Sequence, residues 1–168
     1  SMILLCGTLI VFAQLNYMRR QSLGVRTDRI LVVKFPGPTE GMKIKMEAMR
    51  KAIRKLPLVS KVTCSGSVPG EEVAMFLSNR RTHDALKQNR LYEMLSCDPD
   101  YMDAYGLELV AGRGFSEDYG DDVNKLVINE TAARTLGYTD YESVIGEEIS
   151  VETIEEPMQV IGVVKDYH

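Results

Sequence analysis

The chain has few of the residues on which most small-protein chemistry depends. Its 168 residues contain no tryptophan, two histidines and three cysteines. A Ser-His-Asp or Cys-His catalytic centre would need one of the histidines, His83 and His168, which lie far apart in the sequence. His83 sits in a polar stretch, where we expect a solvated loop histidine, and His168 is the last residue given.

The cysteines also exclude familiar sites. Cys6, Cys64 and Cys97 form no C-x-x-C pair, which excludes the usual zinc modules and a thioredoxin-type redox pair. Cys64 and Cys97 both fall in predicted strands, so a disulfide and two buried thiols remain equally open. No P-loop sequence exists, and Gly112-Arg113-Gly114 is too short for a dinucleotide fingerprint and predicts a turn.

One acidic cluster has the chemistry of a cation site but not the spacing. It consists of Glu117, Asp118, Asp121 and Asp122, which do not match the alternating oxygen ligands of an EF-hand, so we expect solvated loop charge. The sequon at Asn129 is better explained as a helix N-cap. The sequence therefore assigns no catalytic residue, no cofactor-binding residue and no metal ligand, and it predicts no cofactor.

Charge is distributed unevenly along the chain. Residues 1–84 carry 14 basic and 6 acidic side chains, a net +8, whereas residues 85–168 carry 6 basic and 18 acidic ones, a net −12. A basic arm for nucleic acid would need aromatic residues interleaved with the cations. Here the cations gather on one amphipathic helix and near the N-terminus, so we expect the two halves to complement each other within one fold.

The N-terminus begins with an apolar run over residues 2–15, shorter than the ~20 residues that cross a bilayer. Tyr17, Arg19 and Arg20 follow it, as an interfacial aromatic and cations follow a span. We therefore expect residues 1–20 to be the end of a truncated transmembrane helix. The alternative is a helix of a soluble core.

The remaining residues predict an α+β fold with mixed β-sheets and flanking helices, built from two strand–helix–strand units. The first unit has a buried strand at residues 30–35, a helix from 39 to 56, and a strand at 58–68. One apolar stripe marks that helix, at Met42, Met46, Met49, Ile53 and Leu56. The second unit has a strand at 125–128, a helix at 129–136, and strands around 149–151 and 160–164.

Between the two units the pattern is less regular. Strands are predicted at residues 73–77 and 90–97, with a loop or short helix over 80–89. A short helix follows Asp98-Pro99-Asp100 and stops at Gly106, and residues 112–124 predict an acidic loop.

Several segments together resemble one family, the MacB-like periplasmic core domain of FtsX-type ABC transporter permeases. The carrying segments, in family order, are residues 14–18, 23–24, 28–33, 98–102 (DPDYM), 105–113 (YGLELVAGR), 127–137 (VINETAARTLG), 145–146 and 160–168 (VIGVVKDYH). Cys97 stands where the family more often has an aliphatic residue. The resemblance implies residues 21–168 as an extracytoplasmic (periplasmic) core domain, truncated at its C-terminal edge.

The resemblance also implies a function. A permease of this kind transmits ATP-driven conformational change across the membrane for substrate export or extraction, and ATP is hydrolysed by a cytoplasmic ATP-binding subunit or fused domain. The implied partners are that subunit, a second permease copy and a periplasmic adaptor protein. The membrane is reached through the N-terminal helix, and no nucleic acid is bound. The domain itself is then no enzyme, and it lies in the periplasm at the cell inner membrane.

Two other functions fit a domain that follows a membrane helix. A ligand-binding extracytoplasmic sensor domain of a membrane receptor would contain a closed pocket. A membrane-anchored hydrolase would contain a carboxylate pair or a reactive cysteine in a cleft, with a perturbed pKa.

Overall fold

The structure is a computed structural model that describes residues 2–20, 23–35, 41–71, 73, 75–82, 89–120 and 122–167. The elements in chain order are α1 (Met2–Arg20), α2 (Met42–Ile53), β1 (Phe76–Arg81), β2 (Arg90–Glu93), α3 (Tyr101–Tyr105), β3 (Leu109–Gly112), η1 (Glu117–Tyr119), β4 (Lys125–Asn129), α4 (Glu130–Thr135), η2 (Glu142–Val144), β5 (Glu148–Val151) and β6 (Met158–Val164).

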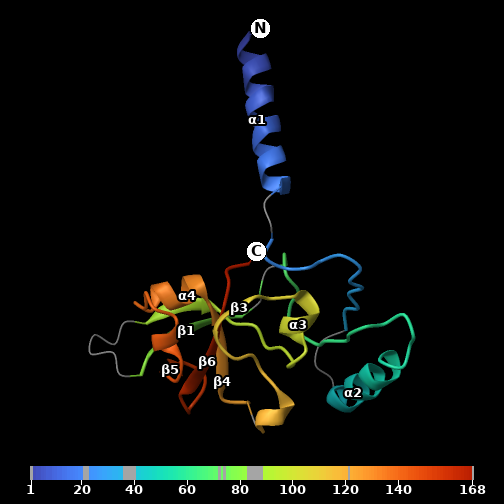
Figure 1. The fold of residues 1–168 in the computed structure, drawn as a ribbon, viewed down its shortest axis with the longest axis vertical. Coiled ribbons are helices and arrows are strands. Elements are labelled where there is room, and N and C mark those ends of the chain that lie inside the picture. The colour runs from blue at the N-terminus through green and yellow to red at the C-terminus, as the bar shows by residue number, and fades with distance from the viewer. Residues whose placement is uncertain are drawn as a thin grey trace.

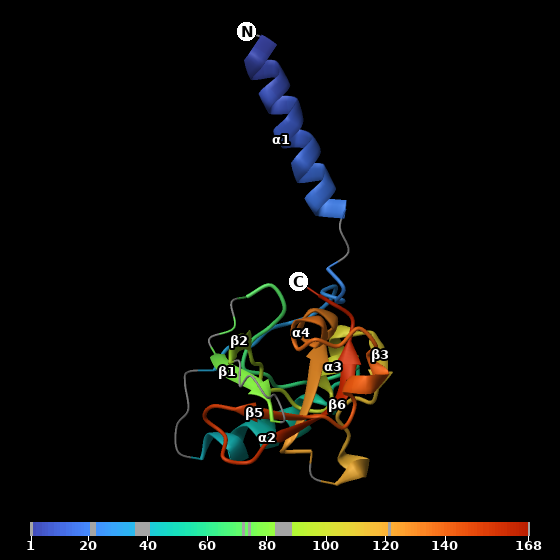
Figure 2. The same ribbon diagram turned by 90° about the vertical axis from the view of Figure 1, so that its left-hand side faces the viewer.

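The six strands form one mixed sheet around β6. Along one edge, β6 pairs in parallel with β4. Along its other edge it pairs antiparallel with β5 near its start and with β3 near its end. The sheet continues from β5 to β1 and from β1 to β2, both antiparallel (Figures 1 and 2). The predicted α+β class with a mixed sheet is confirmed.

The core is built on β6, where every residue except Gln159 is buried. Val160 and Val163 are fully enclosed, and they share a cluster with Val144 of η2 and Ala133 of α4. A strand that is buried on both faces needs the continuous apolar run that the sequence shows at this place. The strand predicted at residues 160–164 is confirmed, with two additional residues at its start.

Strands β3 and β6 approach each other so closely that two glycines are required. Gly112 has φ +67°, and a Cβ there would lie 2.3 Å from the Ile161 carbonyl oxygen. A Cβ on Gly162 would lie 2.1 Å from the Arg113 carbonyl oxygen. The sequence pattern predicts a turn at residues 112–114 and no strand at β3, because a glycine within a short strand has the same local pattern as a turn.

The second strand–helix–strand unit is confirmed in β4, α4 and β6. The Asn129 side chain accepts a hydrogen bond from the Ala132 amide at 2.9 Å, so it caps α4 as expected. Gly137 follows the helix with φ +97°, a conformation that favours glycine.

The first strand–helix–strand unit is not formed, and this prediction is wrong. Residues 30–35 join no ladder, and their apolar side chains are exposed, to 87% at Leu31. Residues 58–68 contribute one isolated bridge, between Ser65 and Cys97. A strand gains its stability from cross-strand partners, and β-propensity alone does not supply them.

The helix between these segments is confirmed, although it is shorter than predicted. The predicted start at residues 39–40 lies outside the described residues. Met42, Met46, Met49 and Ile53 are half-buried, whereas Leu56 lies beyond the end of α2 and is 53% exposed. The stripe therefore faces the domain only in part.

The central region follows the sequence pattern with shifted bounds. The strand predicted at residues 73–77 corresponds to β1, which begins and ends later than predicted. Its last two residues, 80 and 81, belong to the range where a loop or short helix was expected, and residues 83–88 of that range lie outside the described residues. The strand predicted at 90–97 is confined to β2. Helix α3 is confirmed, and it buries Tyr101 against Tyr105 with ring centroids 4.8 Å apart.

Helix α1 stands apart from the rest of the molecule in both views (Figures 1 and 2). Nearly all of its described side chains are exposed, including Ile3, Leu4 and Phe12. Among the described residues, no helix combines the length and the apolar character that crossing a bilayer requires.

Candidate functional site

The segment that follows α1 is fastened to the end of α3. The Arg26 amide donates a hydrogen bond to the Tyr105 carbonyl oxygen at 2.7 Å, and its guanidinium Nη2 donates to the Asp103 carbonyl oxygen at 3.3 Å. Gly106 ends α3 with φ +65°, and a Cβ there would lie 2.4 Å from Arg26 Nε. A side chain at position 106 would therefore displace the Arg26 guanidinium.

The same segment also touches the residues that follow β6. Gly24 has φ +73°, and a Cβ there would lie 2.8 Å from the Asp166 carbonyl oxygen and 3.1 Å from Tyr167 Cα. In Figures 1 and 2 the C-terminal end of the described chain accordingly lies beside the segment that leaves α1. We call this meeting point the junction; it borders a hollow of about 330 Å³ lined by Gly24, Val25, Arg26, Gly106, Glu108, Lys165 and Asp166.

Asp166 connects the junction to α4. Its carboxylate accepts hydrogen bonds from the Thr131 amide and hydroxyl, both at 2.8 Å, and from Arg134 Nη2 at 2.6 Å. Burial opposes ionisation of Asp166, but these hydrogen bonds outweigh burial and hold its pKa below the usual value. The junction thus joins the exit of α1, the end of α3, the end of β6 and the start of α4.

A second network holds α2 against the loop before α3. Asp98 accepts from the Cys64 amide at 2.9 Å and lies 3.7 Å from Arg50 Nη1. Asp100 accepts from Arg50 Nη2 at 2.6 Å and also pairs with Arg54. These two carboxylates have a structural role, because they tie α2 and the segment after it to α3.

The cysteines do not form a disulfide. Cys64 and Cys97 are free thiols. Cys97 lies opposite Ser65 in the isolated bridge, and successive side chains point to opposite faces, so Cys64 and Cys97 face opposite ways. Burial raises the pKa of Cys97 to about 11, so this thiol is protonated and unreactive at neutral pH.

The acidic loop is held by an arginine. Asp122 accepts two hydrogen bonds from the Arg113 guanidinium, at 2.8 and 2.9 Å, and they lower the pKa of Asp122. Arg113 in turn lies 4.3 Å above the Tyr119 ring. Within the described ranges no three acidic, histidine or cysteine groups gather in a way that could hold a metal ion. Asp121, His83 and His168 lie outside the described residues.

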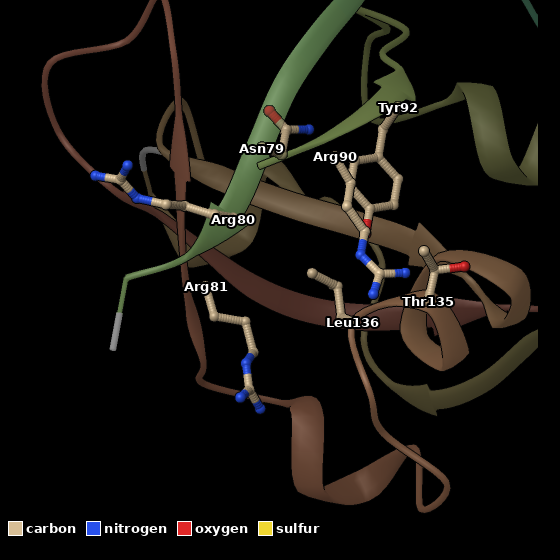
Figure 3. Close-up of a pocket in the computed structure, with 7 residues that line it drawn as sticks. All are labelled: Asn79, Arg80, Arg81, Arg90, Tyr92, Thr135 and Leu136. Atoms are coloured by element: carbon tan, nitrogen blue, oxygen red, sulfur yellow. The ribbon is translucent and has the colours of Figure 1, made fainter. Parts of the chain in front are cut away.

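A small polar cavity of about 40 Å³ lies where β1 and β2 meet the end of α4. We call it the arginine pocket; its lining residues, drawn in Figure 3, are Asn79, Arg80, Arg81, Arg90, Tyr92, Thr135 and Leu136. Asn79 is 6% exposed, and within the described part of the chain neither its Oδ1 atom nor the buried Tyr92 hydroxyl has a hydrogen-bond partner.

The model of the MacB-like periplasmic core domain matches residues 2–168. The chain belongs to this family. The resemblance to the MacB-like periplasmic core domain stated from the sequence is confirmed. No curated protein sequence matches the chain.

Solved structures share the fold of this MacB-like domain at low sequence identity. The periplasmic region of MacB from Actinobacillus actinomycetemcomitans is 21% identical over 79% of the chain, with a TM-score of 0.53. The extracellular domain of the noncanonical ABC-type transporter YknZ from Gram-positive bacteria is 20% identical over 71%, with a TM-score of 0.54. A domain assigned to a permease of Porphyromonas gingivalis is 20% identical over 70%, with a TM-score of 0.52. The chain covers 58%, 57% and 45% of these three structures, respectively.

Three of the family segments meet in the junction of the MacB-like domain. Gly24, Gly106 and Asp166 come from three separate stretches on which the resemblance was based. The sequence pattern predicts Gly106 only as a helix stop and predicts no role for Arg26. The signal for the junction is a glycine in each of two family segments, Gly24 and Gly106, both of which adopt a positive φ.

Proposed function

We propose that the chain is the extracytoplasmic domain of an ABC transporter permease, which transmits ATP-driven conformational change across the membrane for substrate export or extraction. In this proposal residues 1–20 are the end of a transmembrane helix at the cell inner membrane, and residues 21–168 are the periplasmic core. The partners are a cytoplasmic ATP-binding subunit or domain, where ATP is hydrolysed, a second permease copy and a periplasmic adaptor protein.

The junction is the observation that carries the proposal. A helix can move a domain as a body only if the chain leaving the helix is fastened to the core, because a loose linker absorbs the displacement. Here Arg26 is hydrogen-bonded to the backbone at the end of α3, and Gly24 packs on the residues after β6. A displacement of α1 would therefore act at the same time on the end of α3 and on the residues that follow β6.

The proposal is tested on the native protein in its membrane. An antibody raised against this chain should detect a membrane-integral protein several times larger than 18.9 kDa, and immunoprecipitation in mild detergent should co-isolate ATPase activity. Recovery of a soluble protein of about the size of this chain would contradict the proposal.

A second measurement tests transmission. Hydrogen exchange of the isolated complex, with and without a non-hydrolysable ATP analogue, should change at the Arg26 amide, which the junction protects. The Arg113 amide, bonded to the Ile161 carbonyl oxygen at 2.8 Å inside the sheet, is the internal control and should not change. Equal exchange at Arg26 in both nucleotide states would refute transmission through the junction.

A further inference from the structure

The arginine pocket presents hydrogen-bond donors from one face of the β1–β2 hairpin. Asn79 is the cross-strand partner of Arg90, and Leu77 is that of Tyr92. Because side chains alternate along a strand, Asn79, Arg90 and Tyr92 project from the same face, toward the end of α4. Figure 3 shows the Arg90 guanidinium between the Tyr92 ring and Leu136, whereas Arg80 extends from β1 in another direction.

The chemistry of the pocket is that of an anion site. In the described part of the chain, Arg90 has neither a carboxylate partner nor a hydrogen bond. Among the described residues the buried Tyr92 hydroxyl has no acceptor, and burial raises its pKa against the opposing charge of Arg90, so it remains a donor. Buried polar groups in folded proteins are almost always paired, so the Tyr92 hydroxyl indicates a missing acceptor, and the exposed Arg90 guanidinium beside it supplies positive charge.

Asn79 can serve as a further donor. Its Nδ2 atom makes only a long contact to Met94 Sδ, at 3.5 Å. A half-turn of the amide brings its two N–H groups to where Oδ1 now lies without a partner. The pocket then offers donors from an amide, a phenol and a guanidinium.

We propose that the arginine pocket binds the carboxylate of an acidic side chain presented by a protein partner. A cavity of about 40 Å³ holds roughly three water-sized groups, which suits the three atoms of a carboxylate better than a phosphate with its ester. A guanidinium holds a carboxylate through two parallel hydrogen bonds, and the phenol donates a third. The partner reaches the pocket beside β2, an edge strand that among the described residues pairs only with β1.

The test titrates the 168-residue chain with acetate at constant ionic strength and follows the side-chain N–H signals of arginine by NMR. Acetate should shift the Arg90 Nε–H signal in a saturable way. Arg90→Gln and Tyr92→Phe should each weaken acetate binding about tenfold or more. Both variants should fold, because Arg90 is exposed and the Tyr92 hydroxyl has no partner to lose.

Arg29→Gln is the matched control. It removes one exposed arginine that does not line the pocket, so acetate affinity should stay within about twofold of the parent chain. N-acetylglutamate methylamide, which carries the same group on a peptide side chain, should compete with acetate.

Three results would overturn the proposal. The first is a linear, unsaturable response to acetate, which would mean that the pocket holds only water. The second is an equal loss of affinity in the Arg29 and Arg90 variants, which would mean general charge attraction. The third is inorganic phosphate binding about tenfold more tightly than acetate, which would reassign the pocket to phosphate groups.

Discussion

Substitution of Gly106 by alanine tests whether the junction is packed as described. Two costs are expected. Alanine in the left-handed conformation at φ +65° costs about 1 kcal/mol. The new Cβ would also lie 2.4 Å from Arg26 Nε, so the arginine must move and lose its hydrogen bond to the Asp103 carbonyl oxygen, for about another 1 kcal/mol. The free energy of unfolding should therefore fall by about 2 kcal/mol.

Gly137→Ala is the matched control. Gly137 also follows a helix at positive φ, but nothing lies within 4 Å of the position that a Cβ would take. Its substitution should cost the backbone strain alone, about 1 kcal/mol. The difference between the two glycine variants isolates the contact with Arg26.

A double-mutant cycle with Arg26→Ala makes this contact explicit. Once the arginine is removed, Gly106→Ala should cost no more than Gly137→Ala, which gives a coupling energy of about 1 kcal/mol. Urea unfolding followed by far-UV circular dichroism measures each variant, provided that the m-value is unchanged. If Gly106→Ala costs the same with and without Arg26, the side chain does not pack on Gly106 and the reasoning fails.

Two further predictions concern the core and the acid stability of the domain. Val160→Ala should lower the free energy of unfolding by about 2 kcal/mol in the same urea assay, because Val160 is fully buried. Leu31→Ala is the control and should change the free energy of unfolding by less than about 0.5 kcal/mol, because Leu31 is exposed. Equal effects of the two substitutions would place Val160 outside the core. The pKa of Asp166 is lowered in the folded state, so its stabilisation is present above the unfolded pKa of about 4 and is lost as pH falls through the folded value. Asp166→Asn should therefore destabilise the domain at pH 7 and make its stability less dependent on pH below about 4. Thermal unfolding across pH 2.5–7 measures both effects. If the variant and the parent chain lose stability equally as the pH falls, Asp166 is not paired as described.

The sequence predicted best where a local signal and burial agree. The apolar run of β6 and the Asn129 cap of α4 have the expected structure because each is stabilised by contacts that the pattern itself encodes. Residues 30–35 have an equally strong apolar pattern, yet the pattern does not supply a neighbouring strand, and their side chains are exposed.

The sites required information that a sequence pattern does not contain. The junction depends on Arg26 meeting Gly106, a contact across about 80 residues that no spacing rule connects. The arginine pocket depends on the register of β1 and β2, which places Asn79 opposite Arg90. A one-residue slip of that register would move Arg90 out of the pocket.

The position of β6 in the sheet also determines the order in which the domain can assemble. β3, β4 and β5 all precede β6 in the chain, and each of them pairs with it. Of the three, none pairs with another of the three in the described sheet, so without residues 158–164 they have no common partner. The ladder of β2, β1 and β5 can form before β6 is in place, whereas β3 and β4 can join the sheet only after it.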